Sequence, residues 1–138
     1  MSPVPRKRAA GKTSLPNPAL SLIRVVHPFP SLLVSAVTMA IALLAINEPE
    51  TGSVIVLGLG MLCFQYAIGL ANDIVDAADD AKSKPWKAIP RGLISRQGAI
   101  AAAAGLAGVG LIITSGLPFR AWLIGMAGLA CGLIYDVQ

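Results

Sequence analysis

Four long apolar segments divide the chain, and none of them contains a charged residue; they cover residues 30–46, 53–70, 99–117 and 121–135. A helix that crosses the hydrocarbon core of a membrane needs about 20 apolar residues, with a range of roughly 17–25. The first three segments reach that length, and the fourth does so if its ends reach the interface or it continues beyond residue 138. None alternates with a period of two, as the strands of a membrane barrel do. The pattern predicts an all-α fold, a polytopic membrane bundle with about four transmembrane helices.

The composition also favours a membrane protein. Of the 138 residues, 55% are hydrophobic and 13% are charged, whereas soluble domains carry roughly 25% charged residues. This high hydrophobicity excludes an intrinsically disordered chain. Two cysteines are too few to build a disulfide scaffold. The same composition argues against a soluble enzyme domain.

Ten of the eleven basic residues lie in two clusters. Five lie within residues 1–24 and five within residues 82–96, between the second and third apolar segments. Because both clusters border apolar segments, membrane topology accounts for them, and we expect no nucleic-acid partner. The positive-inside rule places both in the cytoplasm, together with the whole 71–98 loop. We therefore expect a disordered cytoplasmic arm at residues 1–20 and a transmembrane domain at residues 21–138, in the inner or plasma membrane if the cell is prokaryotic.

Acidic residues gather directly after the second apolar segment, where four of the seven acids of the chain fall within eight residues: Asp73, Asp76, Asp79 and Asp80. If the second helix continues through this stretch, Asp73, Asp76 and Asp80 lie within an arc of roughly 60°. Carboxylates on one helical face repel one another unless a cation neutralises them, and ligands that are all oxygen favour Mg²⁺. The spacing thus predicts a magnesium site, with Asn72 at its flank. The alternative is an acidic loop that ends a helix, although acids at a helix C-terminus oppose the macrodipole.

A basic loop follows the acids and contains Lys84, Lys87 and Arg91. Cations beside a magnesium site can bind the oxygens of a diphosphate. The alternative is that these residues only fix the topology of the loop. If both segments act together, the predicted chemistry is the metal-assisted departure of a diphosphate at the membrane surface.

These segments resemble the UbiA superfamily of intramembrane prenyltransferases, which includes the 4-hydroxybenzoate polyprenyltransferase-like enzymes. Asn72-Asp73-x-x-Asp76-x-x-x-Asp80 is similar to the first aspartate-rich motif of that family. Residues 87–95 resemble its basic-Pro-Leu-x-x-Gly-x-Ile-Ser segment, and Arg24-x-x-His27-Pro28 resembles the segment before its first span. The resemblance extends from residue 21 to the end of the sequence.

The resemblance implies a Mg²⁺-dependent transfer of an isoprenyl group from an isoprenyl diphosphate to a lipophilic acceptor among the membrane lipids. It implies that Asn72, Asp73, Asp76 and Asp80 bind the metal, the three aspartates being catalytic. Ionisation would leave an allylic cation that an electron-rich acceptor attacks. The substrate-binding residues that it implies are Asn72, Lys84, Lys87, Arg91, Arg24 and Tyr135. An ordinary interfacial position is the alternative for Tyr135.

The chain departs from the family pattern in three respects. Ala88 stands where the family usually has proline, and Lys87 replaces a common arginine, which keeps the charge but loses the bidentate fork. The family fold has nine helices and a second aspartate-rich motif, whereas Asp136 is the single acid after Asp80. We therefore expect an N-terminal part of a prenyltransferase domain that is inactive alone. The alternative function is a non-catalytic membrane protein or transporter fragment with a cation-binding acidic loop. The acceptor, the donor chain length and the role of Asp79 have no signature here.

Overall fold

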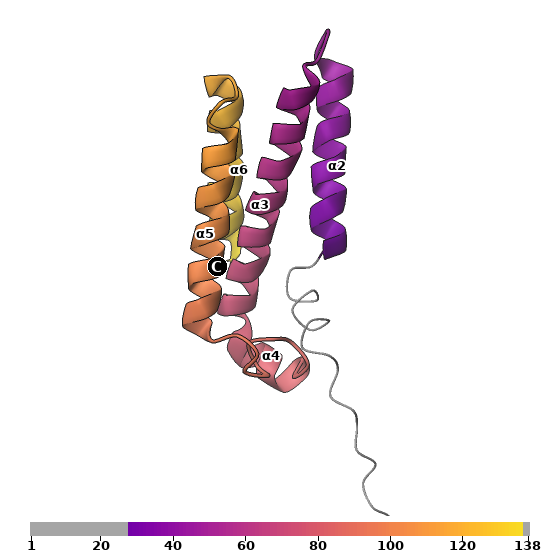
Figure 1. Cartoon of the computed structure of the whole chain (residues 1–138). Coiled ribbons are helices and arrows are strands. Elements are labelled where there is room, and N and C mark those ends of the chain that lie inside the picture. The colour runs from indigo at the N-terminus through magenta and orange to yellow at the C-terminus, as the bar shows by residue number, and fades with distance from the viewer. Residues whose placement is uncertain (1–27, 137–138) are drawn as a thin grey trace, which may run out of the picture.

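The computed structural model describes residues 28–136, and in this range all regular structure is helical (Figure 1). The helices are α2 (Pro28–Ala45), α3 (Thr51–Val75), α4 (Ala77–Ser83), α5 (Arg96–Thr114) and α6 (Phe119–Asp136). All of them except α4 are long and apolar enough to cross a membrane. The prediction of an all-α bundle with four spanning helices is confirmed. The arm expected at residues 1–20 and the candidate Arg24 lie outside the described residues.

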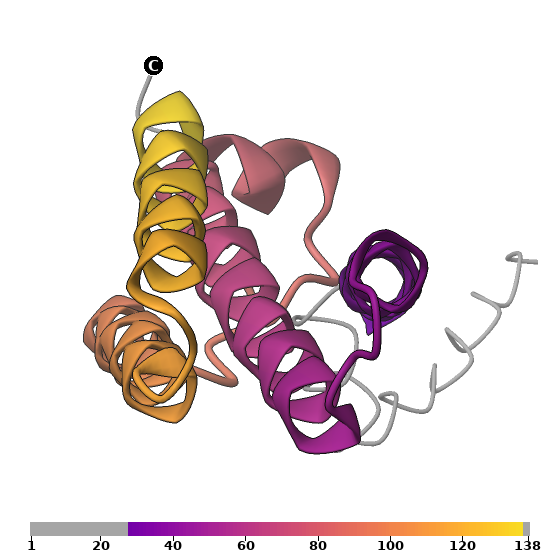
Figure 2. The ribbon, with the colours of Figure 1, turned by 90° about the horizontal axis from the view of Figure 1, so that it is seen from above.

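Helix α3 is the centre of the bundle, because each of the other four helices packs against it. Seen from above, α2 lies on one side of α3, and α5 and α6 lie on the other (Figure 2). Small residues allow the close approach: the Ser35 hydroxyl of α2 donates a hydrogen bond of 2.6 Å to the Gly58 carbonyl of α3. On the other side, a Cβ atom at Gly110 of α5 would lie 2.6 Å from the ring of Phe64. Packing through small residues is the usual way in which membrane helices associate.

Large apolar side chains cover the outside of the bundle. Leu44 of α2 is 88% exposed, and Ile112 of α5 and Ile124 of α6 are each 74% exposed. A soluble monomer rarely presents so much apolar surface, whereas lipid tails solvate it without cost. The outward-facing surface is therefore that of a membrane bundle.

The helix of the second apolar segment continues past Leu70 and includes Asp73, but it does not extend through the whole acidic stretch. Helix α3 ends at Val75, and α4 begins at Ala77 and runs across the end of the bundle (Figure 1). The junction is Asp76, whose ψ of −5° departs from the value of about −42° in a regular helix. In the separate α4, Asp79 and Asp80 stand in the first turn, where the macrodipole favours acids. In one long helix they would stand near the C-terminus, where it opposes them.

The segment from Lys84 to Ser95 connects α4 to α5 and is folded onto the bundle. Ala88 is 2% exposed and packs in a cluster with Leu70 of α3. The chain reverses at Gly92, whose φ of +70° is a conformation that favours glycine. Ser95 then caps α5 by accepting a hydrogen bond of 3.0 Å from the backbone N–H of Gly98. The loop that carries the basic residues is thus held at a defined position against α3.

Candidate functional site

Three charged side chains from three different segments meet at the end of α3. The Lys87 Nζ lies 2.7 Å from Oδ1 of Asp73 and 2.5 Å from Oδ2 of Asp80. Both carboxylate side chains are 3% exposed, and the Lys87 side chain is 14% exposed. Lys84, which is half-exposed, places its Nζ 3.3 Å from Oδ1 of Asp80. We call these four residues the charged cluster.

The bend at Asp76 and the packing of the loop together assemble the charged cluster. Asp73 lies in the last turns of α3 and Asp80 in α4, so the bend decides how the two carboxylates face each other. Lys87 directly precedes the buried Ala88, whose contact with Leu70 fixes the backbone beside α3. The lysine is therefore held at the acids by apolar packing in addition to charge.

The electrostatics of the charged cluster favour the ionised forms. Burial by itself would raise the pKa of the Asp80 carboxyl, but hydrogen bonds from Lys87 and Lys84, and their positive charges, outweigh it and lower this pKa. Burial by itself would lower the pKa of Lys87, but its hydrogen bonds to Asp73 and Asp80 outweigh it and raise this pKa. At neutral pH these shifts keep Asp80 as a carboxylate and Lys87 as an ammonium ion.

The other predicted acids, Asp76 and Asp79, are more exposed than Asp73 and Asp80. Asp76 is partly exposed, and Oδ2 of Asp136, at the end of α6, is buried without a hydrogen-bond partner among the described residues. Asp79 is 90% exposed and forms a surface ion pair of 3.5 Å with Lys82. Of the three acids expected on one helical face, Asp73 and Asp80 share a contact with Lys87, and Asp76 lies at the junction of α3 and α4.

Three predicted substrate-binding residues lie outside the charged cluster and differ in how far they are exposed. Asn72 and Arg91 are partly buried. Tyr135, near the end of α6, is 80% exposed. The exposure of these three residues does not by itself identify a substrate-binding role.

The pair of acids fits a magnesium ion in the chemistry and number of its ligands. Asp73 and Asp80 each direct one oxygen at the same point, where the Lys87 ammonium now lies. Magnesium in proteins is commonly held by one or two carboxylates and completes its shell with water and substrate phosphates. Within residues 28–136, no group of three or more His, Cys, Asp or Glu side chains is arranged to hold a metal ion. The two buried carboxylates are therefore the ligands that this region offers.

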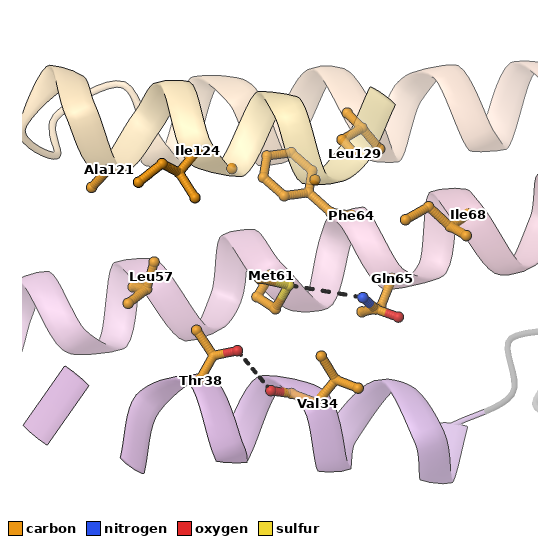
Figure 3. Close-up of a pocket in the computed structure, with 12 residues that line it drawn as sticks. Val34, Thr38, Leu57, Met61, Phe64, Gln65, Ile68, Ala121, Ile124 and Leu129 are labelled. Carbon is orange, nitrogen blue, oxygen red and sulfur yellow. Dashed lines mark hydrogen bonds between the residues drawn. The ribbon is translucent and has the colours of Figure 1, made fainter. Parts of the chain in front are cut away.

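An apolar cavity of about 410 Å³ lies between α2, α3 and α6 (Figure 3). Its lining includes Val34 of α2, Phe64 and Ile68 of α3, and Ile124 of α6. The few polar groups in it are engaged within their own helices; Thr38, for example, donates a hydrogen bond of 2.8 Å to the Val34 carbonyl. Ile68 precedes Asp73 by five residues, or about 7.5 Å along α3. Helix α3 therefore lines the apolar cavity and contributes Asp73 to the charged cluster at its end.

Sequence reasoning did not find this cavity. Its volume depends on the distances between three helices, which the order of residues does not show. One signal could have pointed to it: Gln65, an amide in the middle of the second apolar segment, lies on the cavity wall.

A model described as the UbiA prenyltransferase family matches residues 32–137. The matched range contains the whole charged cluster and nearly all residues of the three helices that line the cavity. No curated protein and no solved structure matches the chain.

Proposed function

The chain belongs to the UbiA prenyltransferase family, and from this premise we propose that it serves the Mg²⁺-dependent transfer of an isoprenyl group from an isoprenyl diphosphate to an aromatic or other lipophilic acceptor. It is a multi-pass membrane protein, with four helices of membrane length. The observation that carries the proposal is the contact of two buried carboxylates, those of Asp73 and Asp80, with the single ammonium of Lys87 at the end of α3.

In the proposed reaction, Asp73 and Asp80 hold the metal, with Asp76 and Asn72 nearby on the same stretch of chain. Magnesium, when bound, neutralises charge on the diphosphate and makes it a better leaving group. Lys84, whose side chain is half-exposed beside Asp80, and Arg91 further along the loop contribute positive charge for the diphosphate oxygens. We place this end of the bundle in the cytoplasm, because the basic residues of the loop follow the positive-inside rule.

The apolar cavity supports the proposal because it suits the prenyl chain of the donor, whereas the charged cluster suits its diphosphate. A prenyl chain is a hydrocarbon, and the lining of this cavity is almost entirely apolar. Exclusion of water from such a cavity protects an allylic cation from hydrolysis until the acceptor reacts with it. Phe64 contributes an aromatic face to this wall. We place Tyr135, which is mostly exposed, at the edge of this site as a further contact for the donor.

Limited proteolysis in detergent micelles tests the proposal without requiring turnover. Trypsin cleaves after basic residues, several of which lie in the loop between α4 and α5. Mg²⁺ together with geranyl diphosphate is expected to slow this cleavage several-fold, because a bound ligand stabilises the folded position of the loop against α3. Asp80→Asn is expected to lose the protection, since it removes a buried metal ligand.

The matched control is Asp79→Asn, which removes an equal charge from the neighbouring, 90% exposed position. It should keep the protection of the parent chain. Identical cleavage of the parent with and without Mg²⁺ and geranyl diphosphate would favour the non-catalytic membrane protein instead.

A further inference from the structure

The cation at the convergence point of Asp73 and Asp80 belongs to the protein itself. The ammonium of Lys87 lies at hydrogen-bond distance from both carboxylates, and its side chain is largely buried. Magnesium bound to the same two oxygens would lie at about 2.0–2.1 Å from each. Two cations cannot occupy this one position, so Lys87 and a metal ion exclude each other there.

The charges of the charged cluster favour such an exchange. Lys87 is the cation that both buried carboxylates contact, and Lys84 adds a second positive charge beside Asp80 alone. Loss of Lys87 would remove the cation that the two carboxylates share, which is strongly unfavourable at a buried position. Asp73 and Asp80 would hold a divalent ion in place of the ammonium, and the displaced Lys87 would then be available to bind diphosphate oxygens beside it.

We propose that Lys87 is a tethered counter-cation: it keeps Asp73 and Asp80 in position while no metal is bound, and it must leave when the metal enters. The identity of the metal rests on the proposed function, whereas the exclusion rests on the geometry. The exchange links metal binding to the loop between α4 and α5, because Lys87 is part of that loop. Lys87 is thus a positioning residue before metal binding and a ligand for the diphosphate after it.

Trp86 provides a readout other than activity. It directly precedes Lys87 and its exposure is 60%, and the chain has one other tryptophan, Trp122. In a Trp122→Phe background, fluorescence therefore reports on the loop beside the charged cluster. The experiment titrates MgCl₂ into the full chain in micelles and follows both the Trp86 emission and the midpoint of thermal unfolding.

Lys87→Met removes the competing cation and keeps the length of the side chain. We expect it to bind Mg²⁺ at least about tenfold more tightly than the parent, a difference of about 1.4 kcal/mol. We also expect Mg²⁺ to raise its unfolding midpoint more than that of the parent. Lys87→Gln keeps a hydrogen-bond donor for the carboxylates and serves as the second variant if Lys87→Met does not fold; the same increase in affinity is expected.

Lys82→Met is the matched control, since Lys82 is 81% exposed and pairs only with the surface residue Asp79 among the described contacts. It should leave the Mg²⁺ affinity within about twofold, because exposed charges are screened. Equal affinity of the parent, Lys87→Met and Lys87→Gln would overturn the exchange while leaving the proposed function intact. If Mg²⁺ changed neither the fluorescence nor the unfolding midpoint of the parent, Lys87→Met and Lys87→Gln, both the exchange and the proposed function would be overturned. Asp73 and Asp80 would then be a structural ion pair with Lys87 and not metal ligands.

Discussion

Two neighbouring aspartates of α4 show opposite surroundings. Asp80 is 3% exposed and its Oδ2 lies 2.5 Å from the Lys87 ammonium, whereas Asp79 is 90% exposed and lies 3.5 Å from Lys82. The residue types are the same in both ion pairs. What differs is the partner: Lys82 extends from α4 itself, whereas Lys87 lies on the loop that packs against α3. The contact between distant segments therefore distinguishes a candidate site from a solvated surface pair.

The difference has an energetic consequence. An exposed ion pair contributes about 0–1 kcal/mol, because water and salt screen it. Removal of one partner from a buried pair costs about 3–5 kcal/mol, because the other charge remains in a medium that solvates it poorly. The two pairs should thus respond very differently to equal changes of charge.

The largest difference is expected between Lys87→Met and Lys82→Met in the presence of a chelator. Lys87→Met leaves Asp73 and Asp80 without their shared counter-ion, and we expect it to lower the free energy of unfolding by about 3–5 kcal/mol. Lys82→Met should lower it by less than about 1 kcal/mol. Thermal unfolding in micelles, followed by the helical signal in circular dichroism, measures both. Equal losses would show that burial does not separate the two pairs.

The membrane-spanning part of the fold could be predicted from the sequence because lipid imposes a local rule. A helix that satisfies its own backbone groups needs only a sufficient length of apolar residues. The predicted segments accordingly differ from α2, α3, α5 and α6 by a few residues at most ends. The exception is α3, which extends past Leu70 to Val75, since polar residues continue a helix once it leaves the membrane core.

The candidate site could be predicted only in part. The spacing of the acids singled out Asp73 and Asp80, but it placed Asp76 with them on one continuous helix. Asp76 instead stands at the junction between α3 and α4, and hydrophobic periodicity carries no signal for this junction. Lys87 was identified as a ligand for a diphosphate, and its contact with the acids depends on the packing of Ala88 against Leu70. Such contacts between distant segments follow from the fold as a whole.

A smaller change in stability is expected from pH. Stability should fall at acid pH because of Asp80 and at alkaline pH because of Lys87. The folded-state pKa of Asp80 is lowered, so its contribution to stability is present above its unfolded value of about 3.9 and is lost as pH falls through the folded value. The folded-state pKa of Lys87 is raised, so its contribution is present below about 10.4 and is lost as pH rises through the folded value. The unfolding midpoint should therefore be level between these limits and fall outside them.

The pH profile also separates the two aspartates. Asp80→Asn should flatten the decrease at acid pH, whereas Asp79→Asn should leave it as in the parent. The measurement is the unfolding midpoint at a series of pH values in one detergent at constant ionic strength. A profile that both variants change equally would assign the acid limb to the net charge of α4 rather than to the buried carboxylate.

The smallest effect concerns the surface pair itself. A double-mutant cycle of Asp79→Asn and Lys82→Met should give a coupling of about 0.2–1 kcal/mol at low salt. At 1 M NaCl, where the Debye length is about 3 Å, this coupling should vanish, because both side chains are at least 81% exposed. The corresponding cycle of Asp80→Asn and Lys87→Met should keep most of its coupling, since ions of the solvent do not reach side chains that are 3% and 14% exposed. If 1 M NaCl removed the Asp80–Lys87 coupling as completely as the Asp79–Lys82 coupling, the Asp80 pair would be accessible to solvent ions. The proposed metal position between Asp73 and Asp80 would then be exposed as well.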